Sequence, residues 1–196
     1  MVNAGIGGHT TTDARARFAE DVLKHKPDIV IIQFGGNDAR VEVFRDPPAS
    51  EPLVALPQFR KNLRHLIGTL KARGAKVVLV TTPRLRWTEK LKKLYGKSPY
   101  KPKDPNGLDV ILVKYAEAMR EVARQQNVPL ADARAAFDAY ARQDGHSIDD
   151  LLLDGMHPNN QGQRLIADLL IPEILAATAK KGDDLRKALD KPDELK

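Results

Sequence analysis

The sequence places a carboxylate close to an imidazole, since Asp154 precedes His157 by three positions in an Asp-Gly-Met-His stretch. A carboxylate that bonds one nitrogen of a histidine ring fixes its tautomer and stabilises the imidazolium, so the other nitrogen can act as a general base. Taken alone, an Asp and a His in a loop before a helix are more often a capping arrangement than a catalytic pair. The catalytic interpretation therefore depends on what else the chain supplies.

Two blocks near the start of the chain carry groups that can stabilise a negatively charged oxygen. Residues 3–11 are rich in glycine, and residues 35–38 read Gly-Gly-Asn-Asp. Backbone N–H groups and the side-chain amide of Asn37 are the kinds of donor that bind the oxyanion of an acyl-transfer intermediate. Together with the Asp-His pair, the two blocks supply the parts of acyl-transfer chemistry except the nucleophile.

Each block also has a structural interpretation. The glycines at 35 and 36 suit a tight turn after a strand, with Asn37 as a turn former or helix cap, and Asp38 is expected to serve the turn rather than the chemistry. The glycines of residues 3–11 suit an anion-binding loop, but this block lacks the P-loop lysine and the Gly-x-Gly-x-x-Gly spacing of dinucleotide sites. A phosphate site is therefore disfavoured.

Composition narrows the class of protein. The 196 residues suit one domain, and the absence of cysteine excludes disulfides, thiolate catalysis and cysteine-bound metals. No apolar run approaches the roughly 18 residues that a membrane-spanning helix needs, and the first residues lack the plan of a secretory signal. No histidine pair has metal-ligand spacing, so neither a metal nor a cofactor is expected. The cellular compartment stays open.

The formal charge of +6 is concentrated in one segment, because residues 84–103 hold eight Lys or Arg against one Glu. Basic residues interleaved with aromatics such as Trp87 and Tyr95 also fit single-stranded nucleic-acid binding. We expect instead a long loop that borders the acyl site as a lid or leaving-group pocket, with Arg84, Arg86 and Trp87 near the substrate. Its charge favours anionic substrates.

Strands alternate with amphipathic helices along the chain. Short apolar runs predict buried parallel strands at 28–34, 76–82 and 128–132. Helical spacing covers residues 11–25, 54–73, 108–126, 133–142 and 160–177. This order predicts a three-layer α/β/α sandwich in which helices cover both faces of a parallel sheet.

The predicted architecture brings the chemical groups to one edge of the sheet. Ligand sites of parallel α/β sheets lie beyond the carboxyl ends of the strands, and residues 35–38 directly follow the first predicted strand. His157 lies in the loop before the last long helix, where Pro158 disfavours helical backbone. Asn159 or Asn160 is the expected N-cap of that helix.

Three blocks in this order resemble a known enzyme family. Asn-x-Gly-x-x-Gly-x-Thr-Thr at 3–11, Gly-x-Asn-Asp at 35–38 and Asp-x-x-His-Pro-Asn at 154–159 are similar to the second, third and fifth sequence blocks of the SGNH (GDSL-type) esterases and lipases. The resemblance covers residues 2–176. It implies the flavodoxin-like SGNH hydrolase fold and a metal-free serine hydrolase that acts on acyl or acetyl esters of small molecules or carbohydrates.

The resemblance also implies residue roles. His157 is the general base, Asp154 holds its ring, and the oxyanion hole consists of the Gly8 N–H and the Asn37 amide. The nucleophilic serine of the family lies in a Gly-Asp-Ser block after the first strand, upstream of the block that contains Gly8, and this sequence begins after it. We therefore expect the N-terminal strand or strands of the fold to be missing and the chain as given to be inactive.

The serines that the chain does contain are Ser50, Ser98 and Ser147. None follows a buried strand or a Gly-Asp pair, so none is expected to be the nucleophile. In the family the first strand is central in the sheet, and its loss is expected to leave the strand at 28–34 with a bare apolar edge and to favour self-association. The expected hydrolase domain is residues 1–177, followed by a charged tail at 178–196.

Two other classes of function stay open. The main alternative is a non-catalytic remnant of the fold that binds a carbohydrate or a protein partner through the basic segment. A nucleic-acid binder is the third class, although no nucleic-acid partner is expected.

Overall fold

The structure of the protein is a computed structural model that describes the backbone of residues 1–189 and the side chains of residues 1–176. Its sheet has three parallel strands in the order β1 (Ile29–Gln33), β2 (Lys76–Val80) and β3 (Leu130–Ala131). In the register of the sheet, Ile29 lies opposite Lys76 and Leu79 lies opposite Leu130.

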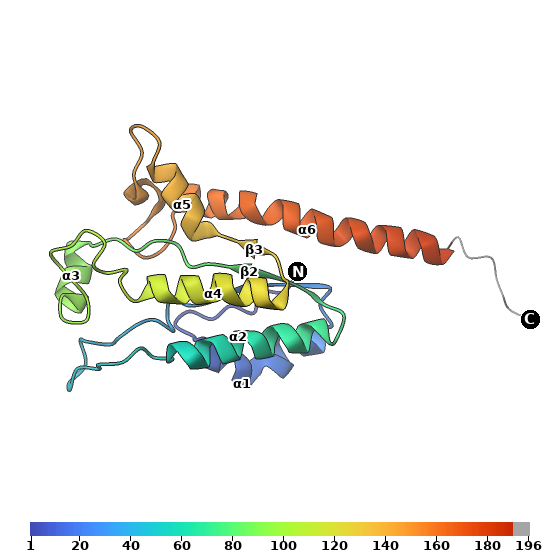
Figure 1. The fold of residues 1–196 in the computed structure, drawn as a ribbon, viewed down its shortest axis with the longest axis horizontal. Coiled ribbons are helices and arrows are strands. Elements are labelled where there is room, and N and C mark those ends of the chain that lie inside the picture. The colour runs from blue at the N-terminus through green and yellow to red at the C-terminus, as the bar shows by residue number, and fades with distance from the viewer. Residues whose placement is uncertain (190–196) are drawn as a thin grey trace, which may run out of the picture.

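Helices cover both faces of this sheet (Figure 1). One face carries α1 (Thr11–Asp21), α2 (Leu56–Lys71) and α4 (Leu112–Gln126), and the other carries α5 (Ala133–Ala141) and α6 (Asn160–Leu189). A short helix, α3 (Glu89–Tyr95), and the 3-10 turns η1 (Leu23–His25) and η2 (Ile148–Leu151) complete the described elements. The predicted three-layer α/β/α architecture is confirmed.

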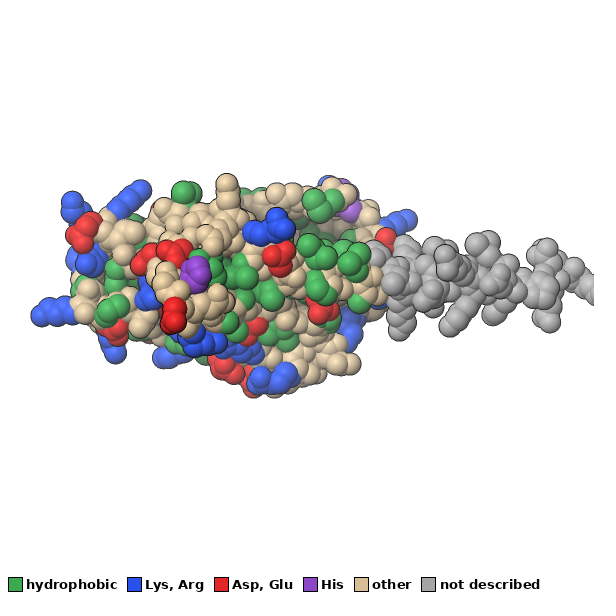
Figure 2. Space-filling model, turned by 90° about the horizontal axis from the view of Figure 1, so that it is seen from above, with side chains coloured by type: hydrophobic (Ala, Val, Ile, Leu, Met, Phe, Trp, Pro, Cys, Tyr) green, Lys and Arg blue, Asp and Glu red, His purple; other side chains and the backbone are tan. Residues whose placement is uncertain are grey.

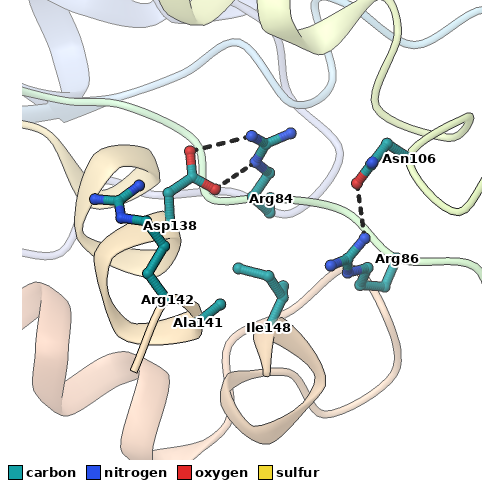
Figure 3. Close-up of a pocket in the computed structure, with 7 residues that line it drawn as sticks. All are labelled: Arg84, Arg86, Asn106, Asp138, Ala141, Arg142 and Ile148. Carbon is teal, nitrogen blue, oxygen red and sulfur yellow. Dashed lines mark hydrogen bonds and ion pairs between the residues drawn. The ribbon is translucent and has the colours of Figure 1, made fainter. Parts of the chain in front are cut away.

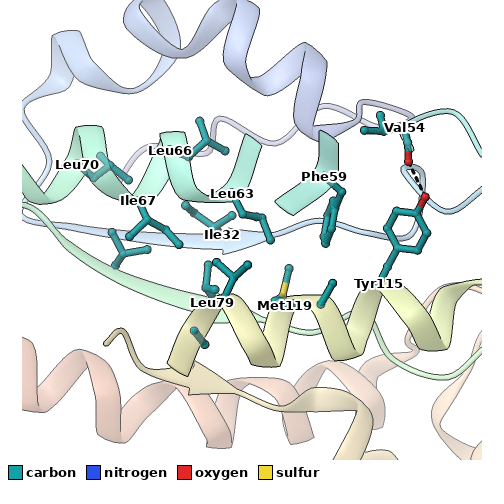
Figure 4. Close-up of a cluster of buried hydrophobic side chains, with 14 of the residues drawn as sticks. Ile32, Val54, Phe59, Leu63, Leu66, Ile67, Leu70, Leu79, Tyr115 and Met119 are labelled. Atoms are coloured by element: carbon teal, nitrogen blue, oxygen red, sulfur yellow. Dashed lines mark hydrogen bonds between the residues drawn. The ribbon is translucent and has the colours of Figure 1, made fainter. Parts of the chain in front are cut away.

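The apolar core is divided between the two faces of the sheet. Figure 4 shows the larger part, where Ile32 of β1 and Leu79 of β2 meet Leu63 of α2 and Met119 of α4. Because strand side chains alternate between faces, Ile29 of β1 packs against the other cluster, under α5 and α6. Burial on both faces fixes the sheet between the helices.

Strand β1 is less buried than the sequence predicts. It lies at the edge of the sheet, and Ile31 is 42% exposed. The cluster beneath α5 and α6 is built on Val78, Val80 and Ala131 of the other two strands, which leaves the same face of β1 partly uncovered. The prediction that this strand is buried on both faces is therefore wrong.

The predicted elements are present with shifted ends. Strand β3 pairs over only two residues, since Pro129 has no N–H and Asp132 already caps α5 by accepting from Ala135 N. Helix α1 ends at Asp21, before Lys26 with its left-handed φ of 46°. Asn159 caps α6, because its Oδ1 accepts from the N–H of residues 161 and 162.

Helix α6 continues past the boundary expected at residue 177 and is described as far as Leu189. The division into a domain at 1–177 and a tail at 178–196 stays a prediction, and residues 190–196 lie outside the described residues.

The expectation of a continuous loop at residues 84–103 is wrong. Thr88 caps α3 by accepting a hydrogen bond from Leu91 N. Leu91 and Tyr95 are four positions apart, so they share one helix face, and both are buried in a cluster with Val41, Val43, Tyr100 and Leu108. The threonine cap and the apolar spacing are the signals that predict this helix.

Candidate active site

The carboxyl ends of β1 and β2 lie side by side, because the strands pair in parallel along their length. Beyond the strands, the Thr82 hydroxyl donates to the carbonyl of Phe34 at 3.1 Å. A Cβ at Gly36 would lie 3.4 Å from the Thr82 methyl group, so the two segments are in close contact. Residues 35–38 therefore stand at the edge where the fold predicts a site.

Asn37 lies against the glycine-rich loop. Its Nδ2 donates to the carbonyl of His9 at 3.1 Å, and its Oδ1 accepts from Arg40 at 3.3 Å. Gly8, next to His9, has a φ of 83°, a left-handed conformation that favours glycine, and it is exposed. Within residues 1–189 the Gly8 N–H has no hydrogen-bond acceptor. Both predicted oxyanion donors thus come from adjoining segments.

Asp38 links the turn at residues 35–38 to the start of α1 by hydrogen bonds. Its carboxylate is buried and accepts from the N–H of Thr11 at 2.9 Å, the N–H of Gly35 at 3.1 Å and the Thr11 hydroxyl. The amide of the buried Asn62 donates to the same hydroxyl at 3.0 Å. Burial raises the pKa of Asp38 above its ordinary value, against the opposing effect of these hydrogen bonds. The role of Asp38 is to hold the turn, as the sequence predicts.

His157 and Asp154 form the predicted pair. Nδ1 of the ring lies 2.9 Å from Oδ2 and 3.1 Å from Oδ1 of the carboxylate. Asp154 also accepts from the N–H of Met156 at 3.0 Å and of His157 at 2.9 Å. Partial burial raises the pKa of Asp154, but the hydrogen bonds from His157 and Met156 outweigh it and lower the pKa to about 2. An ionised carboxylate only accepts, so Nδ1 carries the proton and Nε2 is the basic nitrogen.

The turn that contains Asp154 and His157 packs against the segment that follows β2. The N–H of Arg86 donates to the carbonyl of Gly155 at 2.8 Å. Gly155 has a φ of 87°, and a Cβ there would lie 2.5 Å from the Arg86 carbonyl oxygen. Met156 packs against the cluster that contains Val41, four positions after Asn37. These contacts hold the Asp154 turn against the segment after β2 and against the cluster that contains Val41.

The predicted residues form two separate pairs in the structure: Asn37 adjoins the Gly8 loop, and His157 bonds Asp154. The contacts of Gly155 and Met156 link the second pair to the segment after β2 and to the cluster that contains Val41. No hydrogen bond within residues 1–189 joins one pair to the other, and none links a serine to His157. The exposed fraction of the His157 side chain is 72%, so Nε2 is open to a reacting group. Their catalytic roles stay predictions.

The expected substrate residues of the basic segment are held by side chains from other elements, none of which is among the predicted site residues. Arg84 forms a two-bond ion pair with Asp138 of α5, at 2.7 and 3.1 Å, and reaches Asp109 at 3.3 Å. Asp109 also pairs with Arg134, and both are almost fully buried. Trp87 donates from Nε1 to the carbonyl of residue 104 at 3.0 Å. Because the partners lie far apart in the sequence, no local sequence pattern predicts these ion pairs.

A pocket of about 240 Å³ opens between this segment and α5 (Figure 3). Three arginines, two other polar residues and two apolar residues line it: Arg84, Arg86, Arg142, Asn106, Asp138, Ala141 and Ile148. By contrast, Tyr95 is only 6% exposed and packs edge-on against Phe44 and Tyr100 at 5.5 Å. A buried ring cannot stack on a base, so Tyr95 does not serve as a stacking platform for nucleic acid.

The fold and the site define an SGNH-type hydrolase, and the GDSL-like lipase/acylhydrolase family matches residues 1–165. The chain belongs to this family and is by membership a hydrolase of ester bonds. Within residues 1–189, no helix combines the length and apolar character that crossing a membrane requires.

Similar proteins include two from bacilli. The uncharacterised lipoprotein YqeF of Bacillus subtilis is 33% identical over 176 residues, 85% of this chain and 70% of the relative. An acetylxylan esterase of Geobacillus stearothermophilus is 28% identical over 177 residues, 89% of this chain and 71% of the relative.

The crystal structure of Axe2, an acetylxylan esterase from Geobacillus stearothermophilus, has a TM-score of 0.67 at 27% identity and covers 87% of this chain and 69% of its own. Three further Axe2 structures are of catalytic mutants in which a serine, an aspartate or a histidine is replaced by alanine. In Axe2 that aspartate precedes that histidine by three positions.

Proposed function

We propose that the protein hydrolyses carboxylic esters, acetyl esters of carbohydrates or small molecules among them, by serine chemistry at the edge that carries His157 and Asn37. The observation that carries the proposal is the ring of His157 held by Asp154 at 2.9 Å, with its other nitrogen open. The same spacing of aspartate and histidine at catalytic positions of Axe2 supports these roles. The acetylxylan esterase relative supports an acetyl substrate.

The mechanism follows from the roles of the groups. Nε2 of His157 takes the proton of a serine hydroxyl while the oxygen attacks the ester carbonyl, and Asp154 stabilises the imidazolium. The Gly8 N–H and the Asn37 amide bind the oxyanion. Collapse expels the alkoxide, which takes the proton from His157, and water then releases the acid from the acyl-enzyme by the same path.

The nucleophile is proposed to reside on a strand that pairs with β1 and ends in Gly-Asp-Ser. Among the described residues, β1 has a partner on one side only, and Ile31 is exposed. A parallel strand added there ends at the same edge as Gly35 and Asn37, where its next residue reaches the site. Without that strand, hydrolysis by the chain is expected to stay near background.

A chain in which an apolar strand ending in Gly-Asp-Ser and a crossover helix precede residue 1 tests the proposal, with Gly-Asp-Ala as the matched control. Hydrolysis of p-nitrophenyl acetate is expected from the serine form only. His157→Ala is expected to abolish this activity, and Asn37→Ala to lower kcat by about 100-fold. Equal rates from the serine and alanine forms, both folded by circular dichroism, would refute the mechanism.

The second candidate is a non-catalytic binding protein with the same fold. It is favoured by the lack of any hydrogen bond between His157 and Ser50, Ser98 or Ser147 in the described part of the chain. Binding of xylo-oligosaccharides by a serine-extended chain that shows no hydrolysis is the result expected of this candidate.

A further inference from the structure

The pocket beside the Asp154 turn contains arginine side chains that form no ion pair with an acidic residue among the described residues. The side chain of Arg142 makes no hydrogen bond or ion pair with any described residue. Arg86 donates to Asn106 at 2.7 Å, but its Nε is buried without a partner in residues 1–189. No carboxylate within residues 1–189 forms an ion pair with Arg86, so the charge of its guanidinium is not neutralised by the protein.

The third arginine of the pocket, Arg84, is already paired with an acidic residue of the protein. Arg84 is held by both oxygens of Asp138, so it shapes the pocket wall and neutralises the one carboxylate that lines it. The hydrogen bond and charge of Asp138 raise the pKa of Arg84, which keeps this pair ionised. The positive charges of Arg86 and Arg142 are therefore left to act on a ligand.

The lining favours an organic carboxylate over a bare inorganic ion. Ala141 and Ile148 are the apolar residues of the lining (Figure 3). Because Ile148 is only 3% exposed, Ala141 supplies most of the apolar surface that the carbon face of a ligand can contact. The planar guanidinium matches the two oxygens of a carboxylate. At about 240 Å³ the pocket is smaller than the 300–1,000 Å³ that is usual for a whole small-molecule ligand, so it suits one group of a larger molecule.

The pocket adjoins the proposed acyl site. Arg86, whose side chain lines the pocket, bonds through its backbone to Gly155, between Asp154 and His157. Ile148 belongs to η2, which ends three residues before Asp154. A molecule with its ester at His157 can therefore reach the pocket with a neighbouring group.

We propose that this pocket binds the carboxylate of an acidic ester substrate, such as an acylated sugar acid, through Arg86 and Arg142. The link to an ester rests on the proposed function, whereas carboxylate binding does not. Binding is therefore tested on the chain itself, with sodium glucuronate as the probe and glucose as the uncharged molecule of the same ring size.

Isothermal titration calorimetry at constant ionic strength is expected to give a dissociation constant on the order of 1 mM for glucuronate and no binding of glucose at that concentration. R86Q and R142Q are each expected to weaken glucuronate binding about tenfold. The matched control is R164Q, since the Arg164 side chain is 80% exposed and pairs with Asp168, outside the pocket. Thermal unfolding of each variant verifies that it folds.

Equal binding of glucuronate and glucose, or equal losses in R142Q and R164Q, overturns the proposal. Tighter binding of inorganic phosphate than of glucuronate, lost in R142Q, also overturns it by showing a phosphate site. In the serine-extended chain, hydrolysis without any gain for acidic over neutral acetyl sugars overturns the substrate assignment alone. Glucuronate binding without hydrolysis contradicts the esterase mechanism and leaves the carboxylate site supported.

Discussion

Gly155 shows how a single residue without a side chain positions the proposed catalytic pair. The turn from Asp154 to His157 approaches the backbone of Arg86 so closely that a Cβ would lie 2.5 Å from its carbonyl oxygen. The left-handed φ of 87° adds to the requirement for glycine. The position of the imidazole therefore depends on a residue that takes no part in the chemistry.

Gly155→Ala is expected to destabilise the protein more than Gly145→Ala. Gly145 is the matched control, because its φ is 78° but a Cβ there meets nothing within 4 Å. The left-handed backbone alone costs about 1–2 kcal/mol with alanine, and only Gly155→Ala adds a steric clash. Urea denaturation measures both free energies of unfolding, and equal losses would contradict the importance of the close contact.

Asp154 is expected to titrate differently when its histidine is removed. His157→Gln takes away the ring that helps lower the pKa of Asp154 to about 2, so this pKa is expected to rise towards 3.8. His65→Gln, at an exposed position, is the control. Carboxyl carbon NMR titration measures the change, and a pKa of Asp154 that is the same in both variants contradicts the pairing.

The sign of the pH effect on stability follows from the same shift. Because the pKa of Asp154 is lower in the folded state than 3.8, its ionised form stabilises the fold above pH 3.8. This contribution is lost as the pH falls from 3.8 towards about 2. His157→Gln is expected to reduce the loss over this interval, as measured by urea denaturation at each pH.

At the scale of elements, buried charges tie the segments around the site to the helices. Arg134 of α5 and Asp109, just before α4, are 2% and 3% exposed in their side chains and pair with one another. Arg84, after β2, joins them through Asp109 and Asp138. The segment after β2, the loop before α4 and helix α5 are thereby held in one arrangement.

Arg134→Met is expected to lower the free energy of unfolding by about 3 kcal/mol, because it leaves Asp109 buried without its main partner. The double variant Arg134→Met/Asp109→Leu is expected to recover most of that loss, since no unpaired charge remains. Arg164→Met on the surface of α6 is the control and is expected to change stability by less than about 0.5 kcal/mol. Urea denaturation compares them, and an additive double variant would contradict the coupling.

At the scale of the whole molecule, the exposed strand β1 is the feature with the widest consequence. Figure 2 shows hydrophobic side chains gathered on the surface on the side of α5 and α6. Ile31 of β1 is 42% exposed and points to this side, since Ile29 packs there. A strand that is apolar and open at its edge pairs readily with another chain.

The chain is expected to self-associate, and Ile31→Lys is expected to shift it towards monomer, because a lysine on an edge strand opposes pairing. Val113→Lys is the matched control, since Val113 lies on α4 and is 43% exposed. Sedimentation velocity over a range of concentrations measures the effect. A monomer at every concentration would show that the edge does not bind a second copy.

The sequence by itself determined the order of the three strands and the long helices, and the Gly-Gly-Asn-Asp block that follows β1. These depend on short-range physics: apolar periodicity, caps such as Thr88 and Asn159, and turn residues such as Gly155. The hydrogen bond between Asp154 and His157 is also local, because the two residues are three positions apart in one turn.

Only the tertiary structure decided which distant side chains meet. Arg84 and Asp138 are 54 positions apart, and Thr11 and Asp38 are 27 apart, so packing of the helices on the sheet selects these partners. The burial of Tyr95, the exposure of Ile31 and the pocket between Arg86 and Arg142 arise in the same way. The physical reason is that burial and charge pairing are properties of the assembled layers, whereas helix and strand formation is largely local.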